Sequence, residues 1–475
     1  MVTDGRISDG SVEEGGRPRV VILGGGFGGL NAAKALRRAE ADVYLVDRQN
    51  YHLFQPLLYQ VATAGLGPGD IASPIRAILQ KQKNLQVVLG EVTDIDRQAR
   101  EVTFDTGKLG YDYLIVATGM ETNYFGNDQW EDLAPGLKTM DDALECRRRI
   151  LKVFERAEWS DDPALNESLL TFVIVGAGPT GVEMAGAIRE ISYRVMVHDF
   201  RRIDSSKARV ILIDAGPRVL TAYSEEMSQR AQKDLEEMGV EVRLNAMVED
   251  ICAEGVVVEG ELIRSHTVIW AAGVQASPLA VSLDCELDRM GRVIVEEDLT
   301  IPDDDRVLVI GDLAHLKDES GEPLPGLAPV AIQQGRQAAK NLRIRWSGGR
   351  AEKFRYRDKG KMATLGRAKA IAEIGTRKFA GFFAWLLWLF VHLLFLIGFR
   401  NKVFVVLDWL YAYVGMRRSA RLIIDRRGEV GGGLATGREE ETKLRLSQID
   451  LTDEELLKAE KVLKNPPMTG GSGGE

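Results

Sequence analysis

Short apolar runs alternate with segments of helical periodicity along the first two thirds of the chain. Runs that are apolar throughout are typical of strands in a parallel sheet that helices cover on both faces. The pattern predicts a first group of strands at residues 20–23, 43–47, 86–95, 101–104 and 113–116, with a helix that ends near Arg38. It predicts a second group at residues 172–175, 209–214, 240–244, 255–258 and 267–270, after a helix over 141–159.

The apolar run at 306–310, which leads into a helix over 330–346, returns the chain to the first group of strands. We therefore expect an α/β fold with two Rossmann-like domains, the second inserted in the first. The first domain is expected over 18–169 and 276–350, and the second over 170–275. Residues 1–17 are expected to form a disordered leader.

The leading strand of each group runs into the same glycine-rich pattern, G-x-G-x-x-G. The first turn contains Gly24, Gly25, Gly26, Phe27, Gly28 and Gly29, and the second contains Gly176, Ala177, Gly178, Pro179, Thr180 and Gly181. Between a strand and a helix, this pattern places a pyrophosphate on backbone N–H groups at the helix N-terminus. One chain is therefore predicted to bind two dinucleotides.

Each turn is followed by an acidic residue at the end of the next predicted strand. Asp47 lies 18 residues after Gly29, where a carboxylate accepts both hydroxyls of an adenosine ribose. Asp214 lies 33 residues after Gly181, beyond the usual spacing of about 20, so the intervening segment is extended. A carboxylate there would repel a 2′-phosphate, which favours NADH over NADPH.

Composition narrows the possible functions. The formal net charge of −9 argues against nucleic-acid binding. The polar, acidic N-terminal segment resembles neither a signal peptide nor a transit peptide. The cysteines Cys146, Cys252 and Cys285 are isolated, which disfavours both a redox-active pair beside a flavin and a cysteine-based metal site. No metal site is predicted.

Two apolar segments follow residue 350, one over 379–399 and one over 403–416. Cations flank the first segment on both sides, so neither end is marked as the outer one. We expect two helices in the membrane interface, with the aromatic residues Trp385, Trp388, Trp409, Tyr411 and Tyr413 at headgroup level. A spanning helix and a dimer or core interface are the alternatives. The membrane-anchoring region is expected over 351–427, with amphipathic helices, and a flexible tail over 428–475.

These parts together resemble the two-dinucleotide-fold flavoprotein oxidoreductases, through the first turn, Ala117-Thr118-Gly119, Ala271-Ala272-Gly273 and Gly311-Asp312. Within them, the chain is similar to the type II, non-proton-pumping NADH:quinone oxidoreductases. Three segments carry this similarity: residues 52–60 (HLFQPLLYQ), 181–186 (GVEMAG) and 328–335 (APVAIQQG). Pro329 departs from the family pattern, in which glutamine is frequent at this position.

The resemblance implies non-covalent FAD, NADH as hydride donor to the flavin, and reduction of a membrane quinone. Its expected FAD contacts are Gly24, Gly25, Gly26, Phe27, Gly28, Gly29, Asp47, Arg48, Val92, Ala117, Thr118, Gly119, Gly311, Asp312, Ala328 and Pro329. The expected NADH contacts are Gly176, Gly178, Pro179, Thr180, Gly181, Glu183, Asp214, Ala272 and Gly273. The family also implies a homodimer, peripheral on the cytoplasmic side of a bacterial inner membrane.

The expected catalytic residues are Glu183, near the nicotinamide, and Gln333 and Gln334, near the quinone. Glu183 could instead only favour a helix N-terminus, and the glutamines could be ordinary polar helix positions. His392 could join the quinone site or simply pack. Two other functions stay open: a sulfide:quinone reductase, which needs cysteines near the flavin, and a flavoprotein that recruits partners in the manner of apoptosis-inducing factor.

Overall fold

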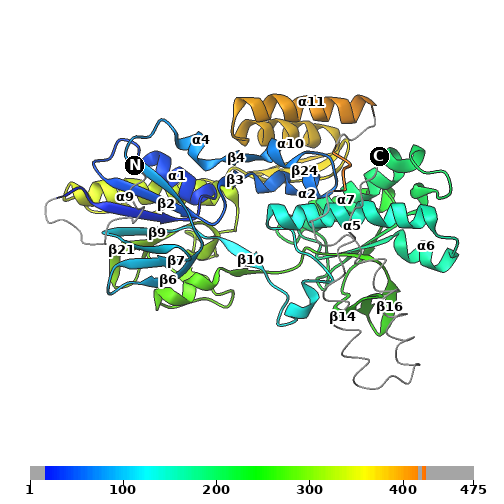
Figure 1. The fold of residues 1–475 in the computed structure, drawn as a ribbon, viewed down its shortest axis with the longest axis horizontal. Coiled ribbons are helices and arrows are strands. Elements are labelled where there is room, and N and C mark those ends of the chain that lie inside the picture. The colour runs from blue at the N-terminus through cyan, green and yellow to red at the C-terminus, as the bar shows by residue number, and fades with distance from the viewer. Residues whose placement is uncertain (1–15, 416–419, 424–475) are drawn as a thin grey trace, which may run out of the picture. The chain divides into compact units, whose positions relative to one another are not determined.

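The computed structural model describes residues 16–415 and 420–423. Its first sheet has the order β20-β21-β9-β1-β2-β5 and is parallel except for β20 (Figure 1). The strands are β20 (Thr300–Ile301), β21 (Asp304–Val309), β9 (Tyr113–Val116), β1 (Arg19–Leu23), β2 (Asp42–Asp47) and β5 (Leu85–Leu89). Helices α1 (Phe27–Ala35) and α9 (Ala328–Trp346) lie against each other beside this sheet. Their close approach requires glycine at position 335, because a Cβ atom there would lie only 2.2 Å from the Gly28 carbonyl oxygen.

The second sheet is parallel, with the order β13-β12-β11-β17. Its strands are β13 (Val240–Arg243), β12 (Arg209–Ile213), β11 (Thr171–Val175) and β17 (Thr267–Trp270), and the nearby helices are α5 (Met140–Trp159), α6 (Pro163–Leu169), α7 (Pro179–Glu190) and α8 (Glu225–Glu237). All four strands fall between β9 and β21 in the chain, which agrees with the predicted insertion. Strands β10 (Met120–Thr122) and β18 (Val274–Ala276) pair where the chain passes between the two sheets.

Two strand predictions were wrong. The segment 86–95 forms two strands: β5 stays in the first sheet, whereas β6 (Val92–Asp96) joins β7 (Glu101–Phe104) and β8 (Gly107–Gly110) in another sheet. Likewise β15 (Gly255–Val258) is the middle strand of an antiparallel sheet with β14 (Val248–Cys252) and β16 (Glu261–Arg264). The short connections on both sides of β15 permit antiparallel pairing but are too short for a parallel crossover.

The remaining elements are short and lie around these sheets. They are β3 (Tyr51–Leu53), α2 (Leu58–Ala62), α3 (Pro68–Ile71), β4 (Ala72–Pro74), α4 (Ile75–Leu79), β19 (Val293–Ile294) and β22 (Ala314–His315). The prediction that α9 follows β21 directly was wrong, because β22 and a long loop lie between them. The expected leader falls mostly, and the tail entirely, outside the described residues.

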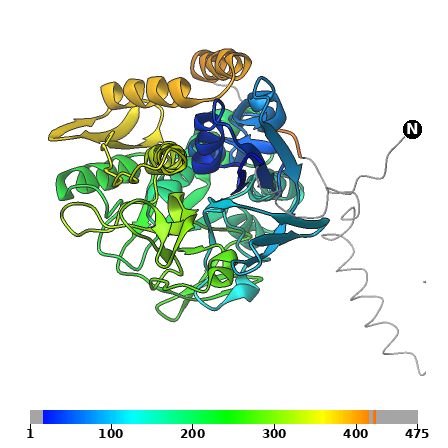
Figure 2. The ribbon, with the colours of Figure 1, turned by 90° about the vertical axis from the view of Figure 1, so that its left-hand side faces the viewer.

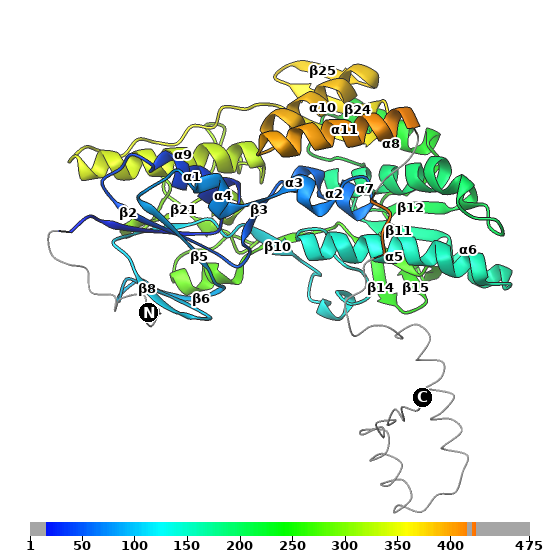
Figure 3. The same cartoon turned by 45° about the horizontal axis from the view of Figure 1, so that its top comes forward.

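After α9 the chain forms an antiparallel sheet of β23 (Lys361–Gly366), β24 (Lys369–Ile374) and β25 (Arg377–Ala380), then α10 (Phe382–Phe395) and α11 (Phe399–Gly415). The apolar segment 379–399 is therefore not one helix, because β25 takes its first residues and Gly381 and Gly398 adopt positive φ at the breaks. In the part of the chain that the structure describes, no helix is both long and apolar enough to cross a bilayer. Helices α10 and α11 lie together, uppermost in Figure 2, and above α2 and α3 in Figure 3.

The predicted tryptophan belt was wrong. Trp385, Trp388 and Trp409 are 7%, 1% and 7% exposed, so they pack inward. The exposed apolar side chains of α10 and α11 are Phe382, Phe383, Leu386, Phe390, Leu394, Phe395, Phe399, Val403, Phe404, Val406, Leu407, Leu410 and Tyr411. The indole N–H of Trp409 donates to Gln60 Oε1 at 2.9 Å, which explains why this ring is buried. The side chain of Tyr413 lies outside the described residues.

Candidate functional site

The first glycine turn has the geometry that its pattern predicts. The Gly24 N–H donates to the Val46 carbonyl at 2.8 Å, and Gly24 has φ of +97°. A Cβ atom on Gly24 would lie 2.5 Å from the Ala117 carbonyl oxygen, and one on Gly29 would lie 1.9 Å from the Gly24 oxygen. Asp47, at the end of β2, accepts a hydrogen bond from the second residue of the turn, and burial raises the pKa of its carboxyl group.

The second turn repeats this geometry almost atom for atom. The Gly176 N–H donates to the Ile213 carbonyl at 2.7 Å, with φ of +105°. A Cβ atom on Gly176 would lie 2.6 Å from the Ala272 nitrogen, and one on Gly181 would lie 1.7 Å from the Gly176 oxygen. Asp214 accepts a hydrogen bond from the second residue of this turn at 2.5 Å. Because the same four contacts recur, both turns are built to bring backbone N–H groups close to a ligand.

A cleft of about 2120 Å³ runs beside the first turn. The predicted site residues that line it are Gly24, Gly25, Gly26, Phe27, Gly28, Asp47, Arg48, Ala117, Thr118, Gly119, Pro179, Thr180, Glu183, Gly311, Asp312, Ala328, Pro329 and Gln333. Those that do not line it are Gly29, Val92, Gly176, Gly178, Gly181, Asp214, Ala272, Gly273 and Gln334. The structure therefore brings most of the predicted FAD contacts together, whereas the second turn reaches the cleft only through the start of α7.

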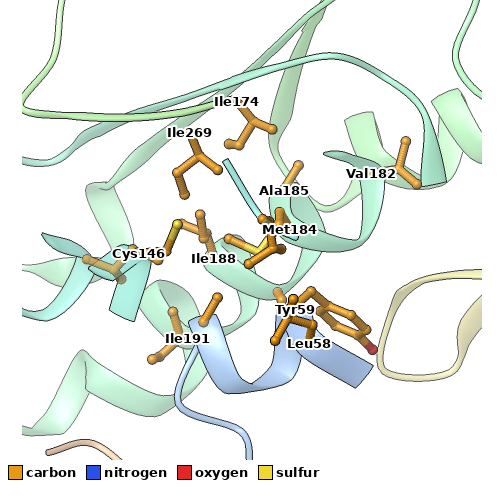
Figure 4. Packing of buried hydrophobic residues seen from close by; sticks show 14 of the residues in the cluster. Leu58, Tyr59, Cys146, Ile174, Val182, Met184, Ala185, Ile188, Ile191 and Ile269 are labelled. Atoms are coloured by element: carbon orange, nitrogen blue, oxygen red, sulfur yellow. The ribbon is translucent and has the colours of Figure 1, made fainter. Parts of the chain in front are cut away.

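Glu183 lies in the first half of α7, facing the cleft. Its helix is held by the core in Figure 4, where Met184, Ala185 and Ile188 pack among side chains from other elements. A Cβ atom on Gly186 would lie 1.8 Å from the Leu365 carbonyl oxygen, so α7 lies directly on the backbone of β23. Burial raises the pKa of Glu183 to about 8. Its main opposing interaction is a long hydrogen bond of 3.4 Å from the Thr364 N–H.

Glu183 also borders a second, much smaller cavity beneath α11. Further residues that line this cavity include Tyr59, Gln60, Glu190, Arg367 and Trp409. One carboxyl group thus stands between the main cleft and a polar cavity on the side of the C-terminal helices.

The two glutamines of α9 are hydrogen-bonded to the backbone. Gln334 is 1% exposed, and its Oε1 accepts from the Gly311 N–H at 2.6 Å. Gln333 donates to the Arg357 carbonyl and accepts from the Arg357 N–H, both at 3.0 Å. Gln334 therefore holds the Gly311 turn in place from behind the cleft wall, and only Gln333 borders the cleft.

An aromatic cluster of His392, Trp388 and Phe54 lies at the α10 end of the cleft. His392 borders the cleft, and its Nδ1 lies 2.7 Å from the Trp388 carbonyl oxygen, while the two rings stack at 4.2 Å. Because a carbonyl can only accept, Nδ1 carries the proton and Nε2 is the acceptor. Burial lowers the pKa of His392 to about 4, so the ring is neutral. Phe54 meets the ring edge-on at 6.2 Å. His392 is thus both packed and part of the cleft.

Lys138 was missed by the sequence reasoning. It borders the cleft and stands immediately before Thr139, the N-cap of α5. A lysine directly before a strong N-cap sequence was the available signal, but the sequence did not show that α5 begins at the cleft. In contrast, no cysteine lines the cleft within the described ranges, and Cys146 is buried in the core.

Comparisons with known proteins agree with this geometry. Residues 18–335 match the model of the pyridine nucleotide-disulphide oxidoreductase family, and residues 359–418 match the NDH2 C-terminal domain. The chain is 48% identical over 427 residues to the type II NADH:quinone oxidoreductase Ndh of Mycobacterium tuberculosis, covering 86% of this chain and 91% of that protein. It is 32% identical over 375 residues to the type II NADH:quinone oxidoreductase of Staphylococcus aureus, covering 77% and 92%.

Among solved structures, the fold is similar to that of NDH2 from Plasmodium falciparum in complex with NADH. The TM-score is 0.78 at 18% identity, covering 86% of this chain and all of that chain. The twin turns, the shared cleft and these matches lead to one conclusion: the chain belongs to the type II NADH:quinone oxidoreductases of the pyridine nucleotide-disulphide oxidoreductase family.

Proposed function

We propose that the main cleft holds FAD non-covalently and that the chain oxidises NADH while reducing a membrane quinone. The main support is that one continuous cleft borders the first glycine turn, Glu183 of α7 and His392 of α10. In such a reaction the hydride donor and the quinone must each reach the flavin. The sulfide:quinone alternative is disfavoured because the described part of the cleft wall contains no cysteine.

The residues of the first turn fit FAD. A Cβ atom on Gly26 would meet nothing within 4 Å, so open space faces the backbone where a pyrophosphate would bind. Thr118 Oγ1 is buried and has no hydrogen-bond partner among the described residues. Asp47 would bind the adenosine ribose, and Asp312 the ribityl or ribose hydroxyls. When bound, FAD supplies the ability to accept a hydride and release two electrons.

NADH would bind over the second turn, with its ribose on Asp214 and its nicotinamide reaching the cleft past Pro179 and Thr180. The carboxylate of Asp214 would disfavour NADPH by repelling a 2′-phosphate. Glu183 would lie beside the nicotinamide end, because it is three residues after Thr180 on the same helix.

The quinone would occupy the apolar end of the cleft, beside Phe54, His392 and Phe395. The neutral His392 presents Nε2 as an acceptor, which suits a hydroxyl of the quinol product. Reducing a quinone with NADH consumes one proton from solution, since the hydride brings only one of the two that the quinol carries. Glu183 is protonated at neutral pH and can donate this proton.

Helices α10 and α11 would lie on the inner face of a bacterial membrane. Their exposed apolar face would bury hydrocarbon surface, and Arg400 and Lys402 would contact anionic headgroups. A homodimer is part of the same proposal. In this arrangement the enzyme is peripheral and faces the cytoplasm, and an insoluble quinone reaches the cleft from the side of α10.

The first experiment measures flavin content and substrate range of the full-length protein. We expect one releasable FAD per chain and turnover of a short-chain quinone with NADH, but not with sulfide and only weakly with NADPH. An absence of flavin, or sulfide as the preferred donor, would refute the assignment. Flavin reduction by NADH without quinone turnover would favour the partner-recruiting alternative.

The second experiment measures flotation with anionic phospholipid vesicles. Phe383→Glu and Phe399→Glu change side chains that are 77% and 84% exposed on the proposed face, and each should weaken binding at least tenfold. Trp159→Glu is the matched control, because Trp159 is 82% exposed but lies on α5. Equal binding by all three variants would show that α10 and α11 do not contact lipid. Sedimentation of the same samples tests the homodimer.

A further inference from the structure

Lys138 borders the cleft, and hydrogen bonds fix its backbone there. Its N–H donates to Asp142 Oδ2 at 2.9 Å, within the capping box of α5. Its carbonyl accepts from Gln55 Nε2 at 3.0 Å. Hydrogen bonds therefore fix the backbone N–H and carbonyl of Lys138. Together with Thr139 and Met140, Lys138 forms part of the cleft wall.

The ammonium group of Lys138 has no partner in the part of the chain that the structure describes. Within the described residues, its Nζ makes no hydrogen bond and lies within 4 Å of no carboxylate. The other lysines and arginines that line the cleft differ, because each pairs with an acidic side chain or extends into solvent, as Arg48 and Lys317 illustrate. Lys138 is only partly exposed, and burial lowers the pKa of its ammonium group.

Asp312 is the acidic group that acts on Lys138 through space. Each residue's charge favours the ionised form of the other, although the two do not touch. The Asp312 carboxylate likewise makes no hydrogen bond within the described residues. Two opposite charges that border one cleft, both desolvated and both unpaired, are arranged to act on a group between or beside them.

The group expected there is the flavin half of FAD, on the proposed function above. Asp47 marks the adenosine end of the cleft, whereas the Lys138 carbonyl accepts from Gln55, the neighbour of Phe54 at the end where His392 lies, so Lys138 lies toward that other end. The oxidised flavin ring is neutral, whereas the two-electron-reduced ring carries a negative charge at neutral pH. A fixed cation near this ring therefore stabilises the reduced form more than the oxidised form.

We propose that Lys138 sets the reduction potential of the bound flavin, with its ammonium group stabilising the negative charge of the reduced ring. Lys138 is thus a residue that tunes the known reaction rather than one that transfers a proton or hydride. The negative charge of Asp312 favours the charged form of the lysine and so opposes the effect of burial on its pKa. This inference rests on FAD binding in the cleft, but it does not depend on which quinone is reduced.

The test compares Lys138→Met, Lys138→Gln and Lys138→Arg in the FAD-loaded full-length protein. The first readout is the two-electron midpoint potential of the flavin against a reference dye. The second is the dissociation constant of sulfite, which forms a bond to flavin N5 with its own electron pair and leaves the ring negatively charged. Neither readout requires quinone turnover.

We expect sulfite binding at least tenfold weaker in Lys138→Met and Lys138→Gln. A tenfold weaker preference for reduced flavin lowers the two-electron potential by about 30 mV. Lys138→Arg, which keeps the charge, should retain most of both values. Lys317→Met, which removes an exposed cation from the same cleft, should leave both unchanged.

Unchanged potential and sulfite affinity in flavin-loaded Lys138→Met would overturn the proposal. Loss of FAD from both neutral variants would overturn it as well, since the cation would then be needed to hold the oxidised flavin. A wild-type protein without flavin or without NADH:quinone turnover would instead contradict the proposed function, and the two failures are therefore distinguishable.

Discussion

Replacing Glu183 with glutamine should remove the part of the pH dependence of the free energy of unfolding that this buried carboxyl causes. The folded protein holds a proton on this carboxyl up to a pKa of about 8, whereas the ordinary value is 4.5. Between these values the folded state binds a proton that the unfolded state does not, so the free energy of unfolding falls as pH rises. Well above pH 8 this carboxyl is ionised in both states, so the free energy of unfolding no longer falls because of it.

The size of the effect follows from the shift. One pKa unit corresponds to about 1.4 kcal/mol, so this single group lowers the free energy of unfolding by at most about 5 kcal/mol from pH 4.5 to pH 8. The partial exposure of Glu183 to the cleft reduces this figure. Because glutamine does not titrate, the stability of Glu183→Gln relative to wild type should rise steadily across this interval.

Urea unfolding of the flavin-loaded protein at several pH values between 5 and 8.5 measures this difference. Glu319→Gln is the control, because its carboxylate borders the same cleft but is 82% exposed. Its difference from wild type should be small and flat with pH. A difference for Glu183→Gln that is equally flat would refute the reasoning, since the carboxyl would then be ionised in the folded protein.

Three further substitutions test the turns and the C-terminal contact. Gly29→Ala places a Cβ 1.9 Å from the Gly24 oxygen, so we expect a cost of about 3 kcal/mol and reduced FAD content; a fully loaded, equally stable variant would contradict this. Trp409→Phe leaves Gln60 Oε1 without its donor and should lower the free energy of unfolding by about 1–3 kcal/mol, and unaltered chemical denaturation would argue against that contact. Asp214→Ser should raise kcat/KM for NADPH relative to NADH about tenfold, and an unchanged ratio would show that this carboxylate does not select the cofactor.

The parts of the site that obey local rules could be predicted. The glycine turns and Asp47 follow from spacing, and Asp214 follows from its place at the end of the next predicted strand, because a strand, a tight turn and a helix lead to that strand. Gln334 shows the limit of this reasoning. Its pattern was recognised, but the sequence does not show that its amide faces the backbone of Gly311 rather than a ligand.

The C-terminal region shows the same limit at larger scale. Composition predicted two apolar helices, and the structure contains two. The break in the segment 379–399 could not be seen, because it depends on β25 pairing with β24 and on the positive φ of Gly381. The burial of Trp409 could not be seen either, because its hydrogen-bond partner, Gln60, is far away in the chain.

The sequence by itself determined the two nucleotide-binding units, each with its leading strand and glycine turn, and the family to which the chain belongs. These features depend on hydrophobic periodicity and on the stereochemistry of glycine, which act over a few residues. Only the tertiary structure decided which polar groups stay unpaired. Among the residues that the structure describes, Lys138 and Asp312 border the cleft without hydrogen-bond partners for their charged groups, whereas Gln333 and Gln334 are hydrogen-bonded to backbone groups. The burial of a side chain and the charges around it depend on contacts between segments that are distant in the sequence. These contacts decide whether a polar group is already hydrogen-bonded or can still act on a ligand.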